Sequence, residues 1–155
     1  MCPSHPWVYY NLGMDIQIAV AATDELYQAF QRLVPQLTNN NPPPSLGLLT
    51  ALVDSEASTL LIARADDGSI LGAAALTVYL VPTGTRAIIE DVIVDGSARG
   101  QGIGEALVRR CLEIAREKGA PAVTLTSNPK REAANRLYQR MGFLRRETNA
   151  YVYKF

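Results

Sequence analysis

The chain has 155 residues, of which 48% are hydrophobic, and its 15 lysine and arginine residues balance 15 aspartate and glutamate residues. A chain of this length and composition can bury a sizeable core, so we expect a globular protein rather than a disordered one. The net charge of zero argues against a general nucleic-acid binder, which needs basic residues in excess to displace counterions. No apolar stretch approaches the ~20 residues that span a bilayer, so no membrane partner is expected.

The two cysteines, Cys2 and Cys111, form no disulfide framework, which favours a reducing compartment. The N-terminal stretch MCPSHPWVYYNLG lacks the basic and apolar regions of a signal peptide. We therefore expect a cytoplasmic protein with an N-terminal extension over residues 1–13 and a single domain over residues 14–155. The only histidine, His5, lies in that extension, so no metal site and no histidine triad are predicted.

Residues 15–20 alternate apolar and polar side chains and predict the first strand. An amphipathic helix follows from Thr23, whose side chain can cap it, and Pro35 is expected to kink or end that helix. The proline-rich residues 38–45 predict a stiff, extended connection. Ser45 can then cap a second, short helix.

Three strands joined by short turns are predicted over residues 59–65, 70–80 and 86–94, and consecutive strands of this kind form an antiparallel meander. The third strand is rich in apolar residues and is expected to be buried on much of both faces. Glu90 and Asp91 stand in its middle. Strict alternation would place these two acids on opposite faces of the sheet, unless a bulge intervenes.

Apolar side chains recur at helical spacing along residues 102–118 and predict a crossover helix. The strand expected next, over residues 122–126, should therefore pair in parallel with the strand before the helix. A last helix over residues 130–141 follows, and strand-like alternation over residues 143–155 ends the chain. This order of elements predicts a mixed α/β domain, with Cys111 as a packing residue of the crossover helix.

The joint between the third strand of the meander and the crossover helix carries the stretch Arg99-Gly100-Gln101-Gly102-Ile103-Gly104. It fits neither the dinucleotide fingerprint, which needs a glycine where Glu105 stands, nor a P-loop, which needs a Lys-Ser/Thr pair. The first N–H groups of a helix lack intrahelical partners and lie at the positive end of the dipole. With the guanidinium of Arg99 they suit an anion such as a pyrophosphate. The alternative is a glycine-rich helix start beside a solvated arginine.

In these surroundings the sequence resembles the GNAT superfamily of N-acetyltransferases. The resemblance rests on IIEDVIVDGSARGQGIGEAL (residues 88–107), on LTSNPKREAANRLYQRMGF (residues 125–143) and on the order of elements. It implies a mostly antiparallel mixed sheet with a splayed parallel strand pair, flanked by about four helices. It also implies direct transfer of an acetyl group from acetyl-CoA, without a metal, to a primary amine of a small molecule or a protein. An acyl-CoA sensor of the same fold is the alternative, and a homodimer stays open.

The resemblance also implies which residues bind acetyl-CoA. The loop from Arg99 to Gly104 would hold the pyrophosphate. The main chain of Val92, Ile93 and Val94 would bond to the pantetheine arm, and Asn135 would contact the same arm. A free backbone N–H near Val92 would stabilise the oxyanion that forms when the thioester is attacked.

Two catalytic residues are expected. Glu90 is the candidate general base, acting through water, because a carboxylate in an apolar strand should have a raised pKa. For Asp91 we prefer an exposed or salt-bridged carboxylate. The resemblance implies that Tyr138 donates a proton to the departing thiolate, and the alternative is a core tyrosine.

Substrate choice is expected to come from residues 38–58 and 79–86. Neither segment carries the dense acidic patch that a polycation would need, and neither carries a basic patch for a phosphosugar, although Arg86 is one candidate anion contact. A protein lysine or N-terminal amine, a small arylalkylamine and an amino acid therefore all stay open as acceptors.

Overall fold

The computed structural model describes residues 13–155, so the expected extension over residues 1–13 lies, apart from Gly13, outside the described part. The chain forms two compact units, one that ends at Leu125 and one that spans Thr126–Phe155. The single domain expected over residues 14–155 stays a prediction. Within the described residues, every helix is too short or too polar to cross a membrane.

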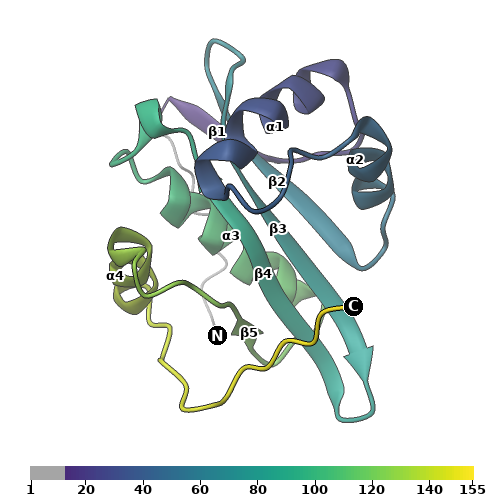
Figure 1. Cartoon of the computed structure of the whole chain (residues 1–155), viewed down its shortest axis with the longest axis vertical. Coiled ribbons are helices and arrows are strands. Elements are labelled where there is room, and N and C mark those ends of the chain that lie inside the picture. The colour runs from purple at the N-terminus through teal and green to yellow at the C-terminus, as the bar shows by residue number, and fades with distance from the viewer. Residues whose placement is uncertain (1–12) are drawn as a thin grey trace, which may run out of the picture. The chain divides into compact units, whose positions relative to one another are not determined.

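The first unit is built on a five-stranded mixed sheet of order β1-β2-β3-β4-β5 (Figure 1). Its strands are β1 (Met14–Ile18), β2 (Ser58–Ala65), β3 (Ile70–Val81), β4 (Gly84–Val94) and β5 (Val123–Thr124). Neighbours pair in antiparallel fashion except β4 and β5, which pair in parallel. The expected meander and the expected parallel pair are both confirmed.

The first unit has the helices α1 (Asp24–Leu37), α2 (Leu46–Val53) and α3 (Ile103–Glu117), with a short 3-10 turn, η1 (Gly96–Ala98), before α3, and the second unit has α4 (Glu132–Arg140). The hydroxyl groups of Thr23 and Ser45 cap α1 and α2, as expected, by accepting hydrogen bonds from N–H groups three residues later. Pro35 does not break α1 at once, because it lies in the last turn and the helix ends at Leu37.

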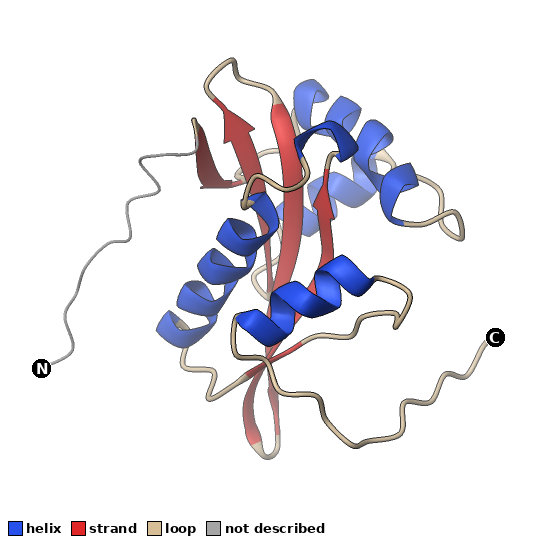
Figure 2. Ribbon diagram, turned by 90° about the vertical axis from the view of Figure 1, so that its left-hand side faces the viewer, coloured by secondary structure: helices blue, strands red, loops and turns tan. Residues whose placement is uncertain are grey.

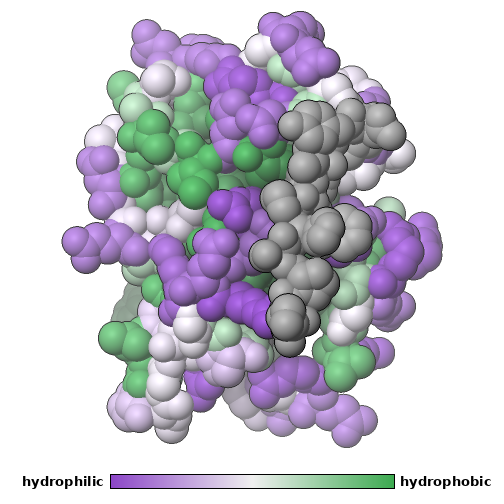
Figure 3. Space-filling model, turned by 180° about the vertical axis from the view of Figure 1, so that it is seen from behind, coloured by the Kyte–Doolittle hydropathy of each residue, from purple (hydrophilic) through white to green (hydrophobic). Residues whose placement is uncertain are grey.

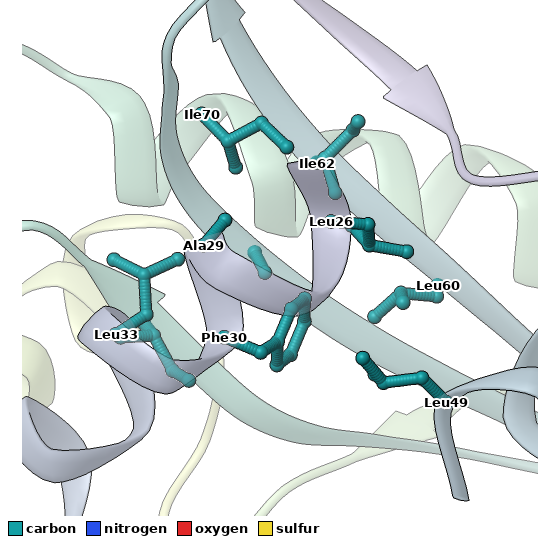
Figure 4. Packing of buried hydrophobic residues seen from close by; sticks show 10 residues of the cluster. Leu26, Ala29, Phe30, Leu33, Leu49, Leu60, Ile62 and Ile70 are labelled. Carbon is teal, nitrogen blue, oxygen red and sulfur yellow. The ribbon is translucent and has the colours of Figure 1, made fainter. Parts of the chain in front are cut away.

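Two apolar layers sandwich the sheet of the first unit. Helices α1 and α2 lie on one face and α3 lies on the other (Figure 2). Under α1 and α2, Figure 4 shows a cluster that draws side chains from both helices and from β2, β3 and β4: Leu26, Ala29, Phe30, Leu33, Leu49, Leu60, Ile62, Ile70, Ala73 and Ile93. On the other face the buried stripe of α3 includes Cys111, where burial raises the thiol pKa to about 12, so Cys111 is a packing residue as expected.

The outer surface carries apolar side chains between polar ones, and Figure 3 shows hydrophobic residues gathered in patches on one face. Exposed apolar residues of the first unit include Val20, Leu48 and Leu80. In the second unit the strand expected over residues 143–155 is not formed, and this prediction was wrong. Alternation of side chains predicts which faces a strand would present, but a strand also needs a neighbour to receive its backbone hydrogen bonds.

Candidate active site

Strands β4 and β5 separate after two paired positions, Ala87↔Val123 and Ile88↔Thr124. From residue 89 to residue 94, β4 has no ladder partner on that edge within the residues that the structure describes. Alternate residues of a strand direct their N–H and C=O groups to opposite edges, so part of the main chain of Val92–Val94 points away from β3. The splayed parallel pair is confirmed, and its open edge suits an extended ligand that bonds to main-chain groups.

A β-bulge interrupts β4 beside this opening. Ala73 of β3 faces Ile93, whereas Ala75 faces Glu90, so β4 holds one more residue than β3 there. Asp91 has a φ of 51°, the only positive φ of a non-glycine residue in the described chain. Aspartate tolerates this left-handed conformation better than most residues do.

The bulge changes where the two acids point. Glu90 and Asp91 are both exposed, so the strict alternation that would separate them does not hold, and the bulge named as the exception is present. The expected burial of this strand on both faces is therefore wrong at the acids. It holds for Ala87, Ile89 and Ile93, which face the core.

The pKa of Glu90 is nevertheless raised above its ordinary value. Partial burial of the carboxyl group is the larger cause, although the residue as a whole is exposed, and the negative charge of Asp91 is the second cause. The direction is the one expected for a general base. The neighbouring charge was not part of the sequence argument.

The loop between η1 and α3 has the conformation of an anion cradle. Gly100 and Gly102 have φ values of 79° and 81°, in the left-handed region that residues with a side chain rarely enter. Gly102 is the N-cap of α3 and supplies no side-chain cap, so the N–H groups of Ile103 and Gly104 have no acceptor within the helix. The exposed Arg99 lies beside them, with its Nε 3.5 Å from the carbonyl oxygen of Val94.

The second unit carries the other two expected site residues. Asn135 and Tyr138 lie three residues apart on α4, hence on one side of the helix, and both are half-buried. The side-chain amide of Asn135 donates a 2.9 Å hydrogen bond to the carbonyl oxygen of Asn128, which ties the start of α4 to the preceding loop. The ring of Tyr138 packs edge-on against Phe143, with centroids 5.8 Å apart.

Two features were missed by the sequence analysis. Ser127 Oγ is buried and has no hydrogen-bond partner among the described residues, which is uncommon for a hydroxyl and makes Ser127 a candidate ligand contact. Arg32 and Gln36 of α1 bond to Asp95 and Gly96, residues 63 and 60 positions away in the chain. No local pattern could have predicted contacts over such separations.

Comparison with known proteins agrees with this geometry. The acetyltransferase (GNAT) family matches residues 23–143. A protein of Oryza sativa subsp. japonica named probable glucosamine 6-phosphate N-acetyltransferase 2 is 34% identical over 97% of this chain and 95% of its own length. A glucosamine 6-phosphate N-acetyltransferase of Trypanosoma brucei brucei is 43% identical over 49% of this chain and 52% of its own length.

Solved structures show the same architecture. A crystal structure of an acetyltransferase from Trypanosoma brucei has a TM-score of 0.73 and 27% identity, and covers 91% of this chain and 99% of its own. The family match spans most of the chain, including the splayed strands and the glycine loop. The protein is an enzyme that acetylates an amine with acetyl-CoA as the donor. The chain therefore belongs to the acetyltransferase (GNAT) family.

Proposed function

We propose that the acceptor is the primary amine of an amino sugar phosphate, with glucosamine 6-phosphate as the reference compound. The observation that carries this proposal is the similarity, over nearly the full length of both chains, to a relative named for that substrate. A second relative with the same substrate in its name matches about half of the chain. This acceptor is not among those that the sequence alone left open, because the sequence shows no basic patch for a phosphosugar beyond Arg86.

Arg86 offers a physical reason for a phosphate on the acceptor. Arg86, Ile88 and Glu90 share one side of β4, because the register with β3 is regular up to Glu90. Arg86 and Glu90 are both exposed, and four strand residues separate them by about 13 Å. A guanidinium and a carboxylate on long side chains can close much of that gap. Arg86, which also donates to Thr83 Oγ1 at 2.7 Å, would hold the phosphate while Glu90 serves the amine.

The residues of this chain divide the chemistry among them. Glu90 removes one proton from the ammonium group through a water molecule, which leaves the neutral amine that attacks the thioester. A backbone N–H at Val92 stabilises the oxyanion as the amine nitrogen bonds to the thioester carbon. Tyr138 then donates a proton to the sulfur as the carbon–sulfur bond breaks, and the second proton lost by the acetylated nitrogen restores the Tyr138 hydroxyl through water. These roles are proposals, supported by the raised pKa of Glu90 and by the open edge of β4.

The proposed donor site uses the glycine loop and the open edge. The N–H groups of the loop Arg99–Gly104 and the Arg99 guanidinium bind the pyrophosphate of acetyl-CoA. The main chain of Val92–Val94 binds the pantetheine arm, with Asn135 as a further contact. Two left-handed glycines and a helix start without a side-chain cap support this placement. We place the enzyme in the cytoplasm, a reducing compartment in which the free thiol of Cys111 persists.

A panel of amines tests the acceptor. Release of CoA is measured with glucosamine 6-phosphate, glucosamine, a lysine peptide and an arylalkylamine at matched concentrations. We expect glucosamine 6-phosphate to give the highest kcat/KM, roughly tenfold or more above glucosamine, because a charge-assisted contact to the phosphate is lost in the latter. Arg86→Gln should lower the ratio of kcat/KM for glucosamine 6-phosphate to kcat/KM for glucosamine. A peptide or arylalkylamine as the best acceptor would refute the proposal without affecting the family assignment.

A further inference from the structure

Helix α1 is fastened to the chain just before the glycine loop by a set of polar contacts. Arg32 Nε donates to Asp95 Oδ2 at 3.0 Å, and another nitrogen of the same guanidinium donates to the carbonyl oxygen of Ile70 at 2.6 Å. One helical turn later, Gln36 Oε1 accepts a 2.8 Å hydrogen bond from the N–H of Gly96. We call Arg32, Gln36 and Asp95 the latch.

Asp95 connects the contacts of α1 with the chain that leads into the glycine loop. Its Oδ1 accepts hydrogen bonds from both the N–H and the hydroxyl of Ser97, at 3.0 and 2.8 Å, and so caps the 3-10 turn η1. Ala98, the last residue of η1, is buried and accordingly fixed in position. Arg99 follows directly, and the loop of left-handed glycines begins at Gly100.

Asp95 is the most tightly held side chain of the latch. Its two carboxylate oxygens have different partners, Ser97 on one side and Arg32 on the other. The side chain is only 14% exposed, whereas that of Arg32 is 49% exposed. The hydrogen bonds from Ser97 and then that from Arg32 lower the pKa of Asp95 to about 2, so the carboxylate is charged at neutral pH.

We propose that Arg32, acting through Asp95, is a positioning residue for acetyl-CoA: the latch holds the entrance of the glycine loop in the geometry that binds the pyrophosphate. The inference rests on the proposed placement of the pyrophosphate at Arg99–Gly104. Neither side chain touches the ligand in this proposal. Loss of the latch loosens the loop, so it weakens the binding of acetyl-CoA and leaves the chemical step unchanged.

Asp95→Asn separates positioning from simple electrostatics. Asparagine keeps the oxygen that caps η1 and cannot pair as an anion with Arg32. Acetyl-CoA is a polyanion, so removal of a nearby negative charge should by electrostatics alone strengthen its binding. The latch predicts the opposite sign. Arg32→Gln cannot make this distinction by itself, because both explanations predict weaker binding.

The chain offers a matched control in Glu25, on the first turn of the same helix. Glu25 pairs with Arg64 of β2 at 2.6 Å, so it also fastens α1 to the sheet through a carboxylate–guanidinium pair. Glu25 and Arg32 are seven positions apart on α1, which is about 10 Å along the helix axis. Glu25→Gln removes the same charge and a carboxylate–guanidinium contact of α1, at a more exposed carboxylate that does not cap the turn before the glycine loop.

Calorimetric titration with acetyl-CoA and steady-state kinetics on the full chain test the proposal. We expect Asp95→Asn and Arg32→Gln to raise the Kd of acetyl-CoA about tenfold, with kcat within about twofold of the parent, and Glu25→Gln to leave Kd unchanged. The double variant with Arg32→Gln and Asp95→Asn should have a Kd for acetyl-CoA close to that of each single variant, because both substitutions break the same Arg32–Asp95 contact. Thermal melting of each variant establishes that the titrated protein is folded.

The possible results distinguish a failure of the latch from a failure of the proposed pyrophosphate site. Unchanged or tighter binding in Asp95→Asn overturns the latch, as does an equal loss in Glu25→Gln, which would mark a general effect on α1. Gly102→Val tests the underlying placement, because a β-branched residue cannot keep the left-handed conformation of the loop. If Gly102→Val leaves acetyl-CoA affinity intact, the pyrophosphate lies elsewhere. If it abolishes affinity while Asp95→Asn does not weaken it, only the latch fails.

Discussion

At the scale of single residues, the bulge in β4 determines the electrostatic surroundings of the proposed base, Glu90. The two neighbouring carboxylates are both exposed, and the charge of Asp91 adds to the partial burial that raises the pKa of Glu90. A base is active only when deprotonated, so a raised pKa moves the acidic limb of the rate profile upward, toward working pH. In the proposed mechanism Glu90 is the base, and the charge of Asp91 helps to set its pKa.

For Glu90→Gln we expect kcat/KM to fall by roughly 10²–10⁴ and the acidic limb of its pH profile to disappear, because glutamine cannot accept a proton. Asp91→Asn is the companion variant. It should keep the limb and move it to lower pH, since the charge that raises the pKa of Glu90 is gone. The profiles are measured with the best acceptor of the panel. An unshifted limb in both variants would assign the titration to another group.

At the scale of elements, the bulge in β4 rests on one residue in an unusual conformation. In a regular strand, glycine is less stable than alanine by roughly 0.5–1 kcal/mol, because it loses more conformational freedom on folding. At the φ of 51° found for Asp91, the order should reverse. We expect Asp91→Ala to be less stable than Asp91→Gly by about 1 kcal/mol in urea unfolding. If Asp91→Ala were instead more stable than Asp91→Gly, residue 91 would lie in a regular strand without the bulge.

The elements also show how far the sequence can be interpreted. Side-chain periodicity and capping residues predicted α1 to α4 and the meander, because local spacing determines which face of an element is apolar. An unusual backbone conformation of the glycine loop could be predicted, because positions with a positive φ favour glycine. The bulge at Asp91 left no such signature, since aspartate occurs in strands, turns and caps alike. The expected strand over residues 143–155 failed for the complementary reason: pairing depends on a partner that the sequence does not name.

At the scale of the whole molecule, Asp95 makes folding sensitive to acid. The pKa of Asp95 is about 2 in the folded chain, below the ordinary value of 3.8 for an aspartate side chain. The stabilisation is therefore complete above pH 4 and is lost as the pH falls from about 4 to 2. The shift corresponds to at most about 2 kcal/mol, because solvent screens the contacts of this partly exposed carboxylate. Urea unfolding curves of the parent and of Asp95→Asn should differ at pH 6 and converge near pH 2. A pH-independent difference would contradict this assignment.

The open edge of β4 has a consequence for association between molecules. A strand edge with unpaired backbone groups is a template on which any extended chain can add, including another copy of the same protein. Glu90 and Asp91 place two negative charges at this edge, and the bulge bends it away from the flat shape that a foreign strand would need. We infer that these two acids, of which Glu90 is the proposed base, also discourage aggregation at this edge. Evolution of a new acceptor preference by loss of these charges would carry a cost in colloidal stability.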